Sequence, residues 1–100
     1  MSKAKKAIRQ AFREAVFARD NHSCRKCQGP GDDAHHITDR TLMPAGGYVV
    51  ENGITLCHSC HEKAEAFHST GTAEVGFHPD DLYKLIDSSY TLAVEASQRL

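Results

Sequence analysis

The four cysteines of this 100-residue chain form two pairs whose spacing suits metal binding. Cys24 and Cys27 make one Cys-x-x-Cys pair, Cys57 and Cys60 make the other, and the inner cysteines are thirty positions apart. Four thiolates in this arrangement are typical ligands of a closed, tetrahedral zinc site. Two disulfides in a secreted protein, or a redox dithiol, are the alternatives. No apolar signal segment precedes Cys24, so we expect a structural zinc ion, a reducing environment and a cytoplasmic location.

Histidines and one acidic residue near the cysteines could hold a second, catalytic metal ion. Adjacent residues of a strand point to opposite faces, so one of His35 and His36 can bind a metal while the other faces a substrate. His61 begins a predicted helix, and Glu65 follows on the same helical face. His35 and His61 would supply two nitrogen ligands and Glu65 an oxygen, which leaves positions for water and a phosphate oxygen. Such open coordination is typical of a catalytic metal.

Several of these residues also have simpler interpretations. Asn52-Gly53 is a dipeptide typical of hairpin turns, which by itself would make Asn52 structural. A single histidine such as His35 is more often an ordinary half-buried side chain than a ligand. We expect His58, which lies between two cysteines, to be exposed or to contact a metal-binding side chain without binding the metal itself. The remaining histidines are expected on the surface: His22, His68 and His78.

The predicted secondary structure places the candidate residues at the joints between short elements. Apolar residues recur at steps of three and four over residues 4–19, which predicts an amphipathic helix. The rest of the chain is expected to form a strand at 34–37, a small hairpin from the β-rich triplets 48–50 and 54–56, a helix over 57–71, and one or two helices over 79–100 that pack on the first helix. No apolar run approaches the roughly 20 residues that span a bilayer, so membrane insertion is not expected.

The formal net charge of −1 hides an uneven distribution. Residues 1–27 contain eight Lys and Arg against two acidic residues, a net +6, whereas the rest contains four against eleven, a net −7. The N-terminal third is therefore the candidate phosphate-facing surface. An ordinary solvated helix face is the alternative. The basic residues that lie mostly off the apolar stripe of this helix are Lys5, Lys6, Arg9 and Arg13.

Five motifs occur in the order Cys24-x-x-Cys27, His35-His36-Ile37, Gly46-Gly47-Tyr48, Asn52-Gly-Ile-Thr-Leu56 and Cys57-x-x-Cys60-His61. In this order they resemble the zinc-knuckle-bearing form of the HNH endonuclease family, which is common in phages and bacteria. The resemblance covers residues 24–65, and the preceding helix that ends in Arg19-Asp20 is also similar. It implies an α+β protein with a small ββα-metal (His-Me finger) fold, a structural zinc site of four cysteines and flanking N- and C-terminal helices. We expect a single domain over 1–100, with a basic helix over 1–20, the zinc-bearing core over 24–70 and a C-terminal helical segment over 79–100.

The resemblance also implies a role for each motif residue. His35 and His61 would bind the catalytic divalent ion, and His36 would be the general base that takes a proton from the attacking water. The side-chain amide of Asn52 would fix the loop or the ring orientation of the base. Some relatives have a histidine where this chain has Glu65, so this carboxylate is a candidate third ligand. A carboxylate oxygen favours Mg²⁺ or Mn²⁺ over Zn²⁺ or Ni²⁺ at the catalytic site.

The expected function is that of a DNA endonuclease or nickase that requires a divalent metal and acts on double-stranded DNA. Phosphate contacts from the four basic residues of the first helix would give binding that weakens with salt and shows little sequence preference. The resemblance suggests phage packaging or recombination machinery as partners, for a protein of a bacterial host or one encoded by a phage. A non-catalytic zinc-ribbon module that binds nucleic acid or protein is the alternative. RNA cleavage would use the same residues, and the oligomeric state stays open.

Overall fold

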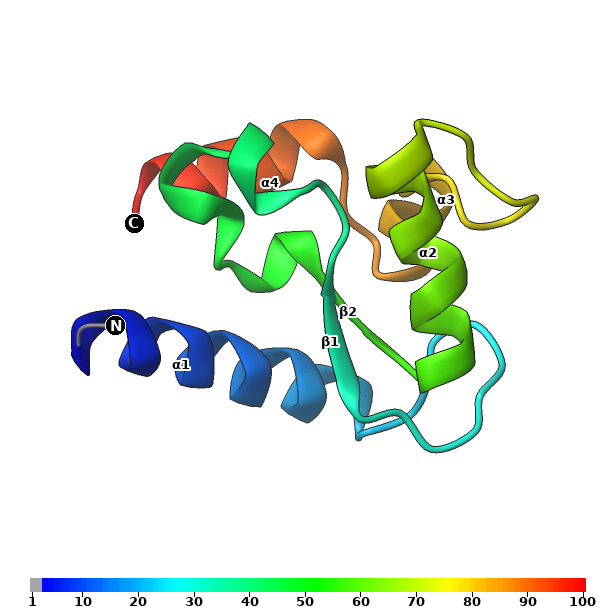
Figure 1. The fold of residues 1–100 in the computed structure, drawn as a ribbon. Helices are drawn as coiled ribbons and strands as arrows, with labels where there is room; N and C mark the ends of the chain where they lie inside the picture. Colours follow the sequence, from blue (N-terminus) through cyan, green and yellow to red (C-terminus); the bar gives the residue numbers. More distant parts are fainter. Residues whose placement is uncertain (1–2) are drawn as a thin grey trace.

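The computed structural model describes residues 3–100, so residues 1 and 2 of the expected N-terminal helix lie outside it. Its helices and strands are α1 (Lys3–Asp20), β1 (Asp33–His36), β2 (Gly53–Leu56), α2 (His58–Thr70), α3 (Pro79–Leu85) and α4 (Tyr90–Gln98). Three short 3-10 helices connect the strands: η1 (Arg40–Leu42), η2 (Pro44–Gly47) and η3 (Val50–Asn52). This is the expected α+β fold, a two-stranded sheet flanked by helices (Figure 1). No helix in the described part of the chain is long and apolar enough to cross a membrane.

The two strands pair antiparallel, with His35 opposite Ile54 and His36 opposite Gly53. The predicted hairpin around residues 51–53 is wrong, because residues 48–50 form no strand and Asn52 ends η3. Gly53 instead begins β2 with extended backbone, at φ −125°. A Cβ atom on Gly53 would lie 2.5 Å from Cγ2 of Val16 in α1. Glycine is therefore needed here because α1 approaches the strand closely, not because the chain turns.

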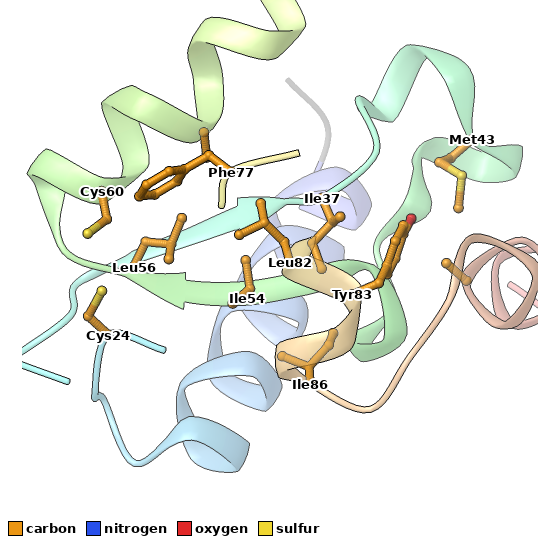
Figure 2. Close-up of a cluster of buried hydrophobic side chains, with 12 residues drawn as sticks. Cys24, Ile37, Met43, Ile54, Leu56, Cys60, Phe77, Leu82, Tyr83 and Ile86 are labelled. Carbon is orange, nitrogen blue, oxygen red and sulfur yellow. The ribbon is translucent and has the colours of Figure 1, made fainter. Parts of the chain in front are cut away.

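Helices cover both faces of the small sheet (Figure 1). On one face, α1 packs its buried residues Phe12 and Val16 against β2. On the other face, α2 and α3 close over a core that includes Ile54 and Tyr83 (Figure 2). Cross-strand neighbours share a face, so His35 lies on the α2 side with Ile54, and His36 lies on the α1 side with Gly53. The sheet thus separates the two histidines, as the alternation of strand side chains predicts.

The C-terminal segment forms two helices, α3 and α4, with the break near Ser89. Ser89 caps α4, because its side-chain oxygen accepts a hydrogen bond from the backbone N–H of Leu92 at 3.1 Å. The expectation that this segment packs on the first helix is corrected, since α4 packs mainly on η2 and η3. The apolar stripe of α1 packs on β2 and is not available to α4. The helix α4 instead covers the 3-10 segments η2 and η3.

A partly buried charged pair, Arg19 and Asp20, fastens the end of α1 to the sheet. Arg19 donates from Nη1 to the carbonyl oxygen of Val50 and from Nη2 to that of Gly53, both at 2.7 Å. The carboxylate of Asp20 accepts from Nε of Arg19 at 2.8 Å and from the backbone N–H of Thr55 at 2.9 Å. Burial raises the pKa of Asp20, but these hydrogen bonds and the Arg19 charge outweigh it and lower that pKa below its ordinary value. The carboxylate is therefore ionised at neutral pH and holds β2 in register against α1.

Candidate active site and zinc centre

The two cysteine pairs meet at one end of the sheet. Cys24 and Cys27 lie on a turn after α1, Cys57 caps the N-terminus of α2, and Cys60 lies in its first turn. All four Sγ atoms lie within 4.8 Å of one another, and Cys27 and Cys57 are 3.7 Å apart. The sulfur atoms of Cys24 and Cys60 point towards each other beside the core (Figure 2). A disulfide requires about 2.05 Å, whereas tetrahedral zinc with bonds of about 2.3 Å separates sulfurs by about 3.8 Å.

The electrostatics of the cluster also suit a bound cation. Burial raises the pKa of Cys24, but hydrogen bonds from backbone N–H groups, chiefly that of Cys27, bring it down to about 6. Burial and the neighbouring thiol of Cys57 raise the pKa of Cys60 to about 12. Four thiolates cannot be held this close without a compensating positive charge. The four cysteines therefore fit a structural zinc ion, and the expected zinc ligands come together in the fold.

His35 points from β1 towards α2 and is almost fully buried, with an exposed fraction of 1%. Its Nδ1 lies 3.3 Å from Oε1 of Glu65 but makes no well-aligned hydrogen bond with any residue that the structure describes. Burial lowers the pKa of His35, so the ring is neutral at neutral pH. The contact with His35 lowers the pKa of Glu65 to about 2, which keeps its carboxylate ionised. A buried ring nitrogen without a partner, next to an ionised carboxylate, fits a metal ligand.

His68 joins this pair, which corrects its expected position on the surface. One nitrogen of His68 and the ligand atoms of His35 and Glu65 all lie within 4.8 Å of one another. The rings of His35 and His68 stack with their centroids 5.1 Å apart. Nε2 of His68 donates to the backbone carbonyl of His36 at 3.0 Å, which leaves Nδ1 free to bind a metal. The spacing of seven residues after His61 on the same helical face is the sequence signal for this role.

His61 lies beside this group, in the first turns of α2. Its Nε2 is 3.2 Å from Oε1 of Glu65, and its Nδ1 is 3.1 Å from Oδ2 of Asp33. Glu65 is thus the residue that contacts both His35 and His61. His58 is 82% exposed and contacts Glu62 at 2.8 Å, which agrees with its expected position outside the site. The nitrogen and oxygen donors around Glu65 fit a divalent ion with open positions.

His36 lies on the opposite face of β1 and packs between two aromatic rings. Its ring stacks on Phe12 at 4.5 Å between centroids and meets Tyr48 edge-on at 4.8 Å. Nε2 is buried and has no hydrogen-bond partner among residues 3–100. Burial, with a smaller effect of His35, lowers the pKa of His36 to about 4. The imidazole is therefore neutral at neutral pH, which is the form that can accept a proton.

His36 shares one hollow of about 300 Å³ with two of the candidate metal ligands, Glu65 and His68. The side chains that line it are His36, Asp39, Arg40, Glu65 and His68. Although His35 and His36 point to opposite faces, the hollow brings His36 together with Glu65, which contacts His35. A group bound in it would contact a neutral imidazole together with Glu65 and His68.

Asn52 is fully buried and fastens the loop that follows His36. Its Oδ1 accepts from the backbone N–H of Thr38 at 2.9 Å and from the hydroxyl of Tyr83 at 2.8 Å. Its Nδ2 donates to the carbonyl oxygens of Thr38 at 3.1 Å and Gly47 at 3.3 Å. These contacts join the loop over residues 38–47 to the start of β2. Asn52 is expected to fix either the loop or the ring orientation of His36. The structure shows that its side chain contacts the loop.

The basic residues of α1 differ in their relation to His36. Arg9 and Arg13 line a hollow of about 170 Å³ together with His36. Lys5 and Arg9 line a larger one of about 420 Å³. Lys6 is exposed on the helix. Arg40 lines all three hollows but was not predicted from the sequence, because it belongs to none of the motifs.

Comparison with known proteins gives one match. Residues 24–67 match the model of the HNH endonuclease family, which spans the cysteine pairs, His35, His36, Asn52, His61 and Glu65. No curated protein and no solved structure matches the chain. The match confirms the resemblance seen in the sequence, and the fold described above is consistent with the ββα-metal fold of that family. It supports nuclease activity in general and a nucleic acid as the substrate.

Proposed function

We propose that the protein is a metal-dependent DNA endonuclease or nickase with His36 as its general base, since residues 24–67 match the model of the HNH endonuclease family. One observation carries the proposal. A neutral imidazole with an unpartnered ring nitrogen lines the same hollow as Glu65 and His68. Phosphodiester hydrolysis needs this combination, because a base must face the water while positive charge is held on the phosphate.

In this proposal His36 accepts a proton from the water that attacks the scissile phosphorus. Stacking on Phe12 and the edge contact with Tyr48 hold its ring in one orientation. Asn52 acts indirectly, because it fixes the loop over residues 38–47 that carries Arg40 into the hollow. Arg40 donates to an oxygen of the bound phosphate. The expected products carry 5′-phosphate and 3′-hydroxyl ends.

The catalytic divalent ion would be held by His35, His61 and Glu65, with His68 as a further candidate ligand. Bound there, it would supply positive charge that offsets the charge developing on the phosphate and on the leaving oxygen. The ionised carboxylate of Glu65 favours Mg²⁺ or Mn²⁺ over Zn²⁺ or Ni²⁺. His35 and Glu65 form the common centre, because both lie beside His61 and both belong to the group of ligand atoms within 4.8 Å of one another. That group includes His68 but not His61.

The proposed substrate is double-stranded DNA, bound mainly through its phosphates. Arg9, Arg13 and Arg40 face the hollows on either side of His36, so positive charge is concentrated beside the base. Such contacts position the backbone without reading bases, so sequence preference should be weak unless a partner supplies it. Phage packaging or recombination machinery would be a partner of this kind.

Plasmid nicking tests the proposal. Purified protein with one zinc ion per chain should nick supercoiled plasmid when Mg²⁺ or Mn²⁺ is added and should leave it intact without added ion. RNA of matched length, offered in competition, distinguishes a DNA enzyme from an RNA enzyme. Absence of cleavage with every divalent ion tried, together with retained nucleic-acid binding, would instead identify a non-catalytic zinc-ribbon module.

A further inference from the structure

Three adjoining hollows run past His36, and Arg40 lines each of them. The first, of about 300 Å³, contains Glu65 and His68. The second, of about 170 Å³, shares His36 with the first and Tyr48 with the third. The third and largest, of about 420 Å³, lies between α1 and the segment from η1 to Tyr48. Because neighbouring hollows share lining residues, they adjoin one another, and this series of hollows, named the track here, leads away from the candidate metal ligands.

Two guanidinium groups meet in the largest hollow at the hydroxyl of Tyr48. Nη1 of Arg40 donates to this hydroxyl at 3.2 Å, and Arg9 approaches it from α1. Although burial raises the pKa of Tyr48, Arg40 and Arg9 together lower it below its ordinary value. Two cations are therefore held close together at a point beyond His36. Guanidinium groups bind phosphate oxygens through paired N–H donors, so a phosphate suits this point.

The other wall of this hollow is apolar and exposed. Ile8 of α1 is 48% exposed although it is a large hydrophobic residue, and it lines the hollow with Ala45 and Gly46. Gly46 has φ +83°, and a Cβ atom there would lie 2.7 Å from the ring of Tyr48. The half-buried Tyr48 ring packs on this turn and makes perpendicular contacts with the rings of His36 and Phe12, which limits the ring surface open to a nucleobase. A deoxyribose, which has C–H groups and no aromatic plane, suits the wall better.

We propose that the largest hollow binds the sugar–phosphate unit next to the scissile phosphate of the cleaved strand. Arg9 holds its phosphate, Arg40 lies between this phosphate and the scissile one, and Ile8 contacts its deoxyribose. This inference rests on the proposed nuclease function and adds a subsite that recognises the backbone irrespective of the base. The track from Glu65 past His36 to Arg9 then sets the course of one strand across the protein.

A binding experiment tests the subsite without using cleavage. The zinc-loaded His36→Ala protein is titrated with a short fluorescein-labelled thymidylate strand, and with a strand of equal length in which every nucleotide is abasic. In this background, Ile8→Glu places a negative charge in the hollow. It should weaken binding of the thymidylate strand by about tenfold or more, because it repels the neighbouring phosphate. Leu92→Glu is the matched control, since Leu92 is 47% exposed on another helix and its substitution makes the same change in net charge.

Two further readouts make the result specific. Arg9→Ala should reduce the slope of log affinity against log salt by about one, as expected for one lost phosphate contact. The abasic strand should bind within about threefold of the thymidylate strand, because bases add appreciably to affinity only where they stack on the protein. Equal weakening by Ile8→Glu and Leu92→Glu would overturn the subsite, and a loss of more than about tenfold with the abasic strand would overturn its independence of the base. Because no cleavage is measured, failure of the nuclease proposal in the plasmid assay is a separate result.

Discussion

Glu65 reaches from α2 to the buried ring of His35 on β1, with Oε1 3.3 Å from Nδ1. The same oxygen lies 3.2 Å from Nε2 of His61, one helical turn earlier. A single carboxylate therefore joins the strand histidine to the helix histidine. In the proposed enzyme this is the centre of the divalent ion site, and it explains why an acidic residue occupies this position in α2.

The first prediction concerns this carboxylate. Glu65→Gln removes the charge but keeps the size of the side chain, so Mn²⁺ affinity should fall by about tenfold or more while the zinc site is retained. Isothermal titration of zinc-loaded protein with Mn²⁺ measures the change. Glu62→Gln is the control, because Glu62 lies on the same helix but contacts the exposed His58. Equal Mn²⁺ affinity in the wild-type and Glu65→Gln proteins would remove Glu65 from the site.

The second prediction concerns the four-cysteine cluster. Cys60→Ala should abolish cooperative unfolding, because the free energy of zinc binding contributes directly to folding in so small a domain. Chelation of zinc from the wild-type protein should have the same effect on circular dichroism. Ser59→Ala changes an exposed residue between the cysteines and should unfold like the wild type. A sharp thermal transition in protein shown by elemental analysis to contain no zinc would contradict the structural role.

The third prediction concerns the loop fastened by Asn52. Asn52→Ala removes an amide with four hydrogen bonds and leaves buried groups of Thr38 and Gly47 unpaired, so we expect a loss of about 3 kcal/mol or more in the free energy of unfolding. Tyr83→Phe removes one of these contacts and the hydrogen bond between the Tyr83 and Thr38 hydroxyls, and should cost about 1–2 kcal/mol. Urea denaturation of zinc-loaded protein measures both. A smaller loss for Asn52→Ala than for Tyr83→Phe would show that the amide does not hold the loop.

The fourth prediction concerns the charged pair at the end of α1. Asp20→Ala leaves the guanidinium of Arg19 without its buried partner, so stability at neutral pH should fall by about 3 kcal/mol. Asp20→Asn keeps a side-chain oxygen for the Thr55 N–H and should cost less. Glu14→Ala, on the exposed side of the same helix, should change stability by about 0.5 kcal/mol or less. Equal effects of Asp20→Ala and Glu14→Ala would contradict the anchoring role.

Local patterns in the sequence predicted the parts of the structure that depend on local geometry. The spacing of Cys24 and Cys27 predicts a knuckle, because both thiols must lie on one short turn. The adjacency of His35 and His36 predicts opposite faces, because strand side chains alternate. Both expectations are confirmed by the fold.

Contacts between distant segments were not predictable in this way. Asn52-Gly53 suggested a hairpin turn, but the Asn52 side chain instead bonds with residues of a loop 14 positions earlier. Arg40 lines the hollow beside His36 because Asn52 fixes the loop that carries it, and no local sequence pattern predicts this position. The sequence predicts a surface position for His68, but in the structure α2 places its ring against that of His35. In each case the deciding partner is far away in the sequence.

Plasmid nicking by the His36→Ala protein tests the central claim most directly. If His36 is the general base, nicking in Mg²⁺ or Mn²⁺ should fall by about 100-fold or more, while the protein keeps one zinc per chain and a cooperative unfolding transition. His58→Ala, at an exposed histidine between the zinc-binding cysteines, should nick like the wild type. A folded, zinc-loaded His36→Ala protein that nicks plasmid as fast as the wild type would contradict the account.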